Sequence, residues 1–225
     1  WSGGGGKTFF ATAGFTAEER HGGTAAGAVL PTTGAPYTEA LETRRVDGGA
    51  VGTVLFRERL LLSGRAAVSQ QRHDHQFGDV RERDRHDTAF GEMTLRVAAG
   101  GHTFIGGLAV EHDAYQPRDL PQFAYAFTVP GAFAQADLAV TTWLSLSGSG
   151  RFDHHSEYGA FFSPRVAALF HYGKWNSRAS FGTGFFGPSP LTEESEAAGL
   201  TRLVIPRALR AEEGRSASLD VSRAA

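Results

Sequence analysis

The sequence predicts an all-β fold, a segment of an antiparallel transmembrane β-barrel with long outer loops and short periplasmic turns. The stretch Leu144–Asp153 alternates strictly, with leucine, glycine and phenylalanine on one face and serine, arginine and aspartate on the other. Several such runs reach about ten residues, the length that a tilted strand needs to cross a bilayer. No run of about 18 apolar residues is present, so strands rather than helices are the candidate spanning elements.

Other stretches repeat this alternation, and they decide between a barrel and a soluble sheet. In Arg59–Gln71, Leu60, Leu62 and Val68 share one face, while Leu61 is an apolar exception on the polar face. Soluble sandwiches also alternate, but their strands average about five or six residues. The polar faces are rich in Ser, Thr, Gly, Arg and Asp, which suits an aqueous lumen. A soluble all-β binding module therefore stays the less favoured alternative.

The connections between these runs are of two kinds. Ala99–Gly101 and Tyr172–Lys174 are short and contain glycine, which favours hairpins. Gly22–Thr38, His73–Asp87 and Pro188–Pro206 are long and polar, and we expect part of the last to be helical. Barrels place their long loops outside and short turns in the periplasm. The expected strands are Lys7–Thr16, Glu39–Asp47, Ala50–Arg57, Arg59–Gln71, Thr88–Ala98, His102–Tyr115, Phe133–Thr141, Trp143–Asp153, Pro164–Tyr172, Lys174–Phe185 and Arg215–Arg223.

Composition excludes several classes of protein. The 225 residues include no cysteine, which excludes a disulfide scaffold and a thiolate metal site. The net charge of -2 gives no basic field for nucleic acid. The chain opens without a signal peptide and ends inside an expected strand. We therefore expect an internal fragment of a longer protein.

No constellation indicates an enzyme, a cofactor or a metal site. His73, Asp74 and His75, with His86 and Asp87 nearby, contain possible metal ligands, but a charged solvated loop is the favoured interpretation. Gly182–Gly184 is not followed by the helix of a phosphate loop. Neither a paired acid and base nor a nucleophile triad has supporting context.

Polar side chains of the expected strands are the candidate ligand contacts. Arg151, Asp153, Arg165 and Arg178 fall on polar faces and would line the lumen, where arginines pair with carboxylates or contact an anionic ligand. The neighbours His154 and His155 stand at a strand end, where they pack a loop or contact ligand. Aromatic residues near strand ends indicate interfacial girdles. These are Trp143, Phe161, Phe162, Tyr172, Trp175, Phe185 and Phe186.

One part of the chain carries motifs as well as a pattern. Phe133–Tyr158 reads FAQADLAVTTWLSLSGSGRFDHHSEY, a SPR triplet follows, and RASFGTGFFGP begins at Arg178. The order and spacing of these elements resemble the TonB-dependent outer-membrane receptors. Phe186 departs from the pattern, because arginine is common there in the family. The matching motif residues are Ser163, Pro164, Arg165, Gly182, Gly184, Phe185, Pro188, Leu191 and Glu193.

The resemblance implies a barrel of about twenty-two strands around an N-terminal plug in the bacterial outer membrane. It also implies energy from the TonB complex, contact with outer-membrane lipid, and a scarce nutrient such as a ferric siderophore, haem or cobalamin. Residues 1–225 would form roughly half of that barrel, without the plug or the C-terminal strands. A passive porin-like channel is the alternative, because it shares the strand chemistry and lacks only the plug.

Overall fold

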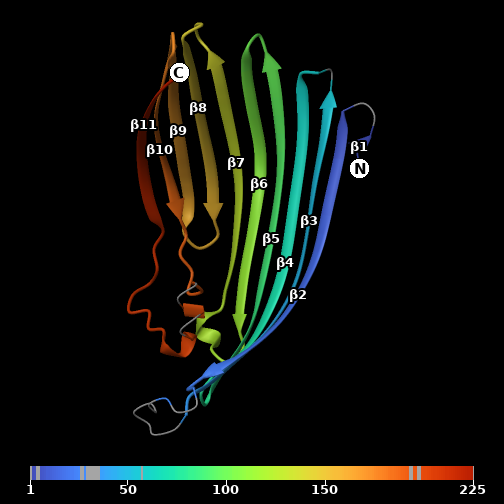
Figure 1. The fold of residues 1–225 in the computed structure, drawn as a ribbon, viewed down its shortest axis with the longest axis vertical. Helices are drawn as coiled ribbons and strands as arrows, with labels where there is room; N and C mark the ends of the chain where they lie inside the picture. Colours follow the sequence, from blue (N-terminus) through green and yellow to red (C-terminus); the bar gives the residue numbers. More distant parts are fainter. Residues whose placement is uncertain are drawn as a thin grey trace.

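The computed structural model describes residues 2–3, 6–25, 28, 36–56, 58–192, 195–196 and 199–224. Within these residues, eleven strands form one sheet in which each strand pairs antiparallel with its neighbours along the chain (Figure 1). The strands are β1 (Ser2–Gly3), β2 (Lys7–Gly23), β3 (Thr38–Phe56), β4 (Leu60–Phe77), β5 (Val80–Ala99), β6 (His102–Pro117), β7 (Tyr125–Ala139), β8 (Leu144–His155), β9 (Gly159–Tyr172), β10 (Trp175–Phe186) and β11 (Glu212–Arg223). The predicted all-β antiparallel fold is confirmed.

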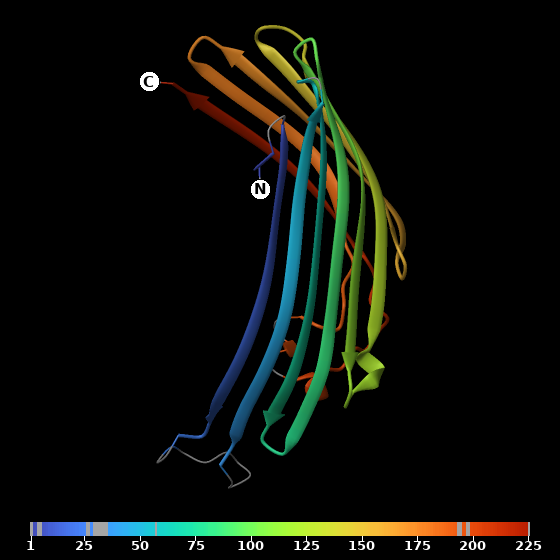
Figure 2. The ribbon, with the colours of Figure 1, turned by 90° about the vertical axis from the view of Figure 1, so that its right-hand side faces the viewer.

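The sheet is strongly curved, as Figure 2 shows. Short connections gather at one end, where the turns at 58–59, 100–101, 140–143 and 173–174 join consecutive strands. The opposite end carries the long connections 24–37 and 187–211, and much of the first lies outside the described residues. A 3₁₀ turn, η2 (Leu200–Arg202), lies in the second, where we expected some helix. Among the described residues, no helix has the length and apolarity needed to cross a membrane.

Two sequence predictions about the strands are wrong. Glu39–Asp47 and residues 50–56 of the expected strand Ala50–Arg57 are parts of the single strand β3, whose ladder runs through Gly48 opposite Val68 without a break, and Arg57 lies outside the described residues. Paired glycines are typical of turns, which is why the sequence suggested an interruption there.

The second error concerns His73–Asp87, which is the tip of a β-hairpin and not a long loop. β4 continues to Phe77, β5 begins at Val80, and only two residues turn the chain. Gly78 makes this turn possible with a φ of 59°, a conformation that favours glycine. Both faces of the hairpin tip are polar, so the hydrophobic alternation that marks a strand is missing.

Alternation divides the sheet into an outer face and an inner face. The outer face carries an apolar belt whose large side chains are exposed, among them Phe15, Val68, Met93 (59% exposed), Leu108 (67%) and Val166. Exposed apolar side chains in a continuous belt are the arrangement that hydrocarbon requires. The inner face is mixed, with the predicted exception Leu61 and also Ile105 among its polar groups.

The long strands extend well past this belt. A tilted strand crosses a bilayer in about 9–11 residues, whereas β3, β4 and β5 contain 19, 18 and 20 residues. On β4 the outward side chains are apolar from Leu60 to Val68 and polar from Gln70 to Gln76. We call the part beyond the belt, which ends in the long connections, the polar zone.

Three of the predicted girdle aromatics stand at the short-turn end of the belt, whereas two others lie on the inner side. Trp143, Tyr172 (83% exposed) and Trp175 are exposed beside the short turns. Phe161 and Phe185 instead stack on each other with ring centroids 4.0 Å apart. Phe161 pairs with the inward Asp153, so this stack belongs to the inner side and not to a girdle.

The two faces give a direct test. Met93 lies at the middle of the outward run of β5, and Thr94 is its inward neighbour. Met93→Arg places a charge in hydrocarbon and is expected to cost about 2–4 kcal/mol of membrane stability, whereas Thr94→Arg faces the lumen and costs much less. Heat-modifiability on gels of outer-membrane fractions measures assembly. Equal losses for the two variants would contradict the assigned faces.

Candidate functional site

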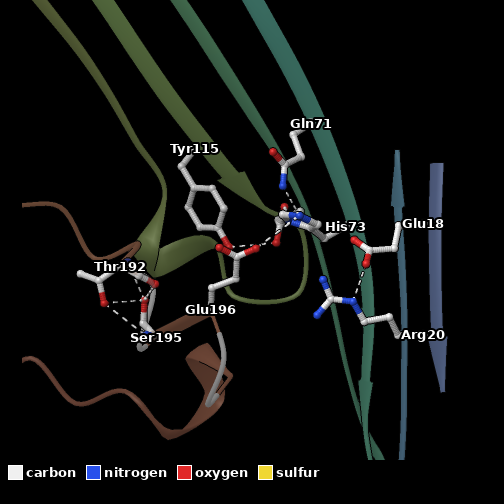
Figure 3. A network of polar contacts seen from close by, with 9 residues as sticks. Glu18, Arg20, Gln71, His73, Tyr115, Thr192, Ser195 and Glu196 are labelled. Atoms are coloured by element: carbon white, nitrogen blue, oxygen red, sulfur yellow. Dashed lines mark hydrogen bonds and ion pairs between the residues drawn. The ribbon is translucent and has the colours of Figure 1, made fainter. Parts of the chain in front are cut away.

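A cavity of about 550 Å³ lies on the inner face of the polar zone. One wall is formed by β2–β6, and the other by the described residues of segment 187–211, which we call the strap. Figure 3 shows side chains of both walls pointing toward one another. The lining residues are Glu18, Arg20, His21, Gly22, Glu39, Leu41, Thr43, Gln71, His73, His75, Glu82, Asp84 and Tyr115 from the sheet and Leu191, Ser195, Glu196 and Leu200 from the strap.

Cross-strand pairing builds the polar network of this cavity. His73 on β4 stands directly opposite Asp84 on β5, and His73 Nδ1 lies 3.1 Å from Asp84 Oδ1. The hydroxyl of Tyr115, which is only 2% exposed, donates to the other oxygen of Asp84 at 3.1 Å. Gln71 Nε2 contacts His73 Nε2 from two residues away on the same strand. The largely covered carboxylate of Asp84 on β5 is therefore satisfied by groups from the two neighbouring strands, β4 and β6.

The strap is fastened to the sheet by one buried carboxylate. Glu82, 9% exposed, accepts the backbone N–H groups of Leu200 at 2.7 Å and of Thr201 at 2.8 Å. Hydrogen bonds to a charged acceptor are roughly twice as strong as neutral ones. A second contact comes from Glu196, whose Oε1 lies 3.4 Å from His73 Nε2.

Apolar packing completes the attachment. Leu200 is 3% exposed and lies in a cluster with Tyr115 and Phe123, against which Leu191 also packs. Gly199 precedes it with a φ of 84°, and a Cβ there would stand 3.0 Å from a Glu82 oxygen. A side chain at this position would push the strap away from its anchor. Glycine is therefore required both by the backbone angle and by the close approach.

The start of the strap is held by the connection between β8 and β9. The hydroxyl of Tyr158 donates to the carbonyl oxygen of Pro188 at 2.6 Å. Burial raises the pKa of Tyr158, which keeps this donor protonated. Further along, the hydroxyl of Ser195 donates to the carbonyl oxygen of Pro190 at 2.9 Å. The strap is thus bound at its beginning and at its middle.

The cavity is acidic. Its lining includes five carboxylates against one guanidinium, that of Arg20, and Glu18 Oε1 lies 2.5 Å from Arg20 Nε. His75 Nε2 lies 3.2 Å from Glu39 Oε1, and its ring lies against that of Phe77 at a tilt of 34°. Asp74 points to the opposite face, so the His73–His75 triplet does not converge. Within the described residues, no three His, Asp or Glu side chains are grouped to hold a metal ion.

The candidates Arg151 and Asp153 lie on the inner face and pair with each other. Arg151 Nη2 lies 2.7 Å from Asp153 Oδ1, and Asp153 is 3% exposed. Arg151 also covers the ring of Phe133, with its guanidinium carbon 5.8 Å from the ring centroid. Gly131 stands opposite Asp153, where any Cβ would collide with the carboxylate. The pair is a structural element of the wall between β7 and β8.

The other four candidates are scattered. Arg165 and Arg178 lie on the inner face and are exposed, but neither lines the cavity beneath the strap. His155 is 5% exposed, and its Nδ1 accepts the backbone N–H of Glu157 at 3.2 Å. His154 falls on the outer face and is exposed, so a lumen contact is not open to it, and a loop contact stays a prediction.

The motif residues surround the root of the strap. Arg165 packs on the buried Gly182, with 3.1 Å between its Cγ and the site of a Cβ there. Ser163, Pro164 and Gly184 belong to the same two strands. Phe185 joins the inner stack, Pro188 accepts from Tyr158, and Leu191 packs in the cluster of Leu200. Glu193 lies outside the described residues.

Sequence reasoning missed most of the cavity. Glu82, Asp84 and Tyr115 were not candidates, and His73 was assigned to a solvated loop. A signal existed in the spacing of His73, His75, Glu82 and Asp84, which are two apart on each arm of a hairpin. The sequence alone did not place the turn at Gly78, so that spacing could not be used.

A comparison with protein families shows to which family this sheet belongs. A family model described as TonB dependent receptor-like, beta-barrel matches residues 6–221. The chain belongs to this family. Among solved structures, the receptor is similar to the siderophore receptor PirA from Pseudomonas aeruginosa, with a TM-score of 0.64 and 12% identity. The match covers 84% of the chain but 32% of PirA, so the chain spans about a third of its length. No curated protein matches the chain.

Membership in the family indicates which parts of a barrel the belt, the inner face and the cavity correspond to. TonB-dependent receptors are outer-membrane β-barrels and transport receptors, and their family is not one of enzymes. At 12% identity the likeness to PirA shows the fold alone. In the receptor, the apolar belt is the lipid-facing surface, the inner face is the lumen wall, and the cavity lies in the lumen beneath the strap.

The anchor of the strap can be tested by removing its carboxylate. Glu82→Ala takes away two hydrogen bonds to a charged group, each contributing about 1.5–3 kcal/mol, so amide exchange at residues 199–203 should accelerate by about tenfold or more. Hydrogen–deuterium exchange of the receptor in detergent measures this. Glu92→Ala is the matched control, because Glu92 lies on the same strand and face and pairs with Arg65. Unchanged exchange at the strap in Glu82→Ala would contradict its role.

Proposed function

We propose that this chain is part of an outer-membrane receptor that actively transports a scarce nutrient, a ferric siderophore or a similar chelate. The carrying observation is the cavity on the lumen face of a TonB-dependent receptor barrel. It is concave, lined by converging polar groups and aromatic rings, and closed on one side by a fixed strap. These are the features of a ligand site. Among the described residues that line the cavity, we identify no acid–base pair or nucleophile positioned for chemistry, so binding rather than catalysis is proposed.

The complete receptor would draw its energy from the TonB complex. Family membership supports this partner, which the described residues do not themselves contact. The long connections and the cavity would then face the outside of the cell, and the short turns the periplasm. The apolar belt would contact outer-membrane lipid. Neither nucleic acid nor a resident cofactor enters the proposal.

A passive porin-like channel remains the second candidate. One observation speaks against it, because the strap occupies the lumen and is held by Glu82, Leu200 and Tyr158. An open pore would be narrowed by such a segment. The two candidates differ in their need for energy, which is measurable.

Uptake in cells tests the proposal. Cells that express the complete receptor should accumulate a radiolabelled ferric chelate from nanomolar medium, and deletion of TonB or a protonophore should abolish uptake. A strain without the receptor is the control for background. Uptake that persists without TonB and scales linearly with concentration would establish the passive channel instead.

The cavity itself is tested by filling it. Leu41 lines the cavity and the preceding Ala40 points to the outer face, opposite Gln76. Leu41→Trp adds a large ring inside the cavity and is expected to weaken chelate binding by about tenfold or more, since overpacking typically costs about 1–3 kcal/mol. Ala40→Trp should bind normally. Equilibrium binding to the purified receptor measures both, and normal binding by Leu41→Trp would place the ligand elsewhere.

A further inference from the structure

Three arginines form a row across the outer face of the polar zone. Arg44 on β3 stands directly opposite Arg72 on β4, and Arg72 stands directly opposite Arg85 on β5. All three alternate outward, because the neighbouring His73 and Asp84 face the cavity. Like charges directly opposite each other in a sheet destabilise it. The row therefore costs stability unless an anion lies between its members.

Carboxylates of this chain do not fill that role for the central arginine. Arg44 Nη2 lies 2.5 Å from Glu42, and Arg85 Nε lies 2.7 Å from Asp87, each within its own strand. The nearest carboxylate along β4 is that of Asp74, which accepts hydrogen bonds from Nε and Nη2 of Arg81.

Arg72 itself is left without a partner. Among the described residues, no hydrogen bond or ion pair involves its exposed side chain. The neighbouring carboxylates of Glu42, Asp74 and Asp87 are already paired with other arginines. A small movement of one of them toward Arg72 would therefore break an existing ion pair. Water hydrates this exposed guanidinium, but only an anion from outside the chain would offset the repulsion within the row.

The depth of the row indicates the source of the anion. Val46 and Val68, the last apolar side chains of the belt on β3 and β4, lie one and two outward positions before Arg44 and Arg72. The row thus stands at the level where hydrocarbon gives way to lipid headgroups. It is exposed on the face that lipid covers, away from the lumen. A dissolved anion would have no reason to prefer this depth over the rest of the polar zone.

We propose that Arg44, Arg72 and Arg85 bind the phosphate of a membrane lipid in the leaflet facing the long connections. Guanidinium groups match phosphate oxygens with two parallel hydrogen bonds, and three of them in a row span a headgroup. The apolar belt below the row holds the acyl chains of the same lipid. The lipid removes the repulsion within the row and fixes the height of the receptor in the bilayer. This surface lies on the opposite face from the ligand cavity and does not depend on which nutrient is carried.

The test uses the complete receptor in detergent and measures its thermal unfolding in the presence of three probes. They are micelles containing lipid A with its phosphates, the same lipid with the phosphates removed, and inorganic phosphate. Only the phosphorylated lipid should raise the unfolding temperature of the native receptor. Arg72→Gln should weaken the apparent affinity by about tenfold, the effect of losing a charge-assisted hydrogen bond. Arg72→Lys keeps the positive charge but loses the planar guanidinium group. Its apparent lipid affinity should lie between those of the native receptor and Arg72→Gln.

Arg81→Gln is the matched control, because Arg81 lies on the same hairpin and face but two outward rows farther from the belt. It should change lipid affinity by less than about twofold. Without lipid, Arg72→Gln should be as stable as the native receptor or more stable, since it relieves like-charge repulsion. Equal effects of Arg72→Gln and Arg81→Gln would overturn the proposal. An equal response to lipid without phosphate would overturn it as well, and a response to inorganic phosphate alone would assign a free-anion site instead.

Discussion

The structure depends on one constraint, that every backbone N–H and C=O inside hydrocarbon must be paired within the protein. Strands β3–β10 meet it on both sides with a ladder in which neighbours along the chain are neighbours in the sheet, whereas β11 and most of β2 each have one edge that the described residues do not pair. All 17 residues of β2, Lys7–Gly23, pair with β3, and β3 to β5 continue in the same unbroken way. In an unbroken ladder, the register alone determines which residues of each strand face lipid. Alternation, and therefore the two-faced sequence, follows from hydrogen bonding.

The same ladder continues beyond the membrane, where a different rule sets the side chains. Beyond the hydrocarbon the inner face meets water and the outer face meets polar headgroups or water, so neither face needs to be apolar. This freedom allows buried polar networks on the inner face, such as His73, Asp84 and Tyr115. It also allows a separate segment to dock there, because Glu82 can receive the backbone donors of η2. The outward side of the same zone is left to charged residues.

How much of this could be predicted follows from those two rules. Within the membrane the pattern is imposed, and the expected strand Trp143–Asp153 differs from β8, Leu144–His155, by one or two residues at its ends. Beyond the membrane no alternation is imposed, so the hairpin tip at His73–Asp87 looked like a loop. The contact that anchors the strap could not be predicted from the sequence for another reason. Glu82 and Leu200 are 118 residues apart, and only the assembled sheet brings them together.

Arg72 and His73 show what period-two geometry makes possible in the polar zone. Adjacent in sequence, they face opposite sides of one strand, His73 toward the cavity and Arg72 toward the outer face. A helix of the same residues would place them about 100° apart on a continuous surface. In the sheet they are separated by the backbone itself, so one strand carries a wall of the cavity and the proposed lipid contact at the same height. Any movement of β4 that ligand binding causes at His73 must therefore also move the arginine row. The anchoring of that row by lipid would hold the wall of the cavity in place, which is the physical link between the two faces.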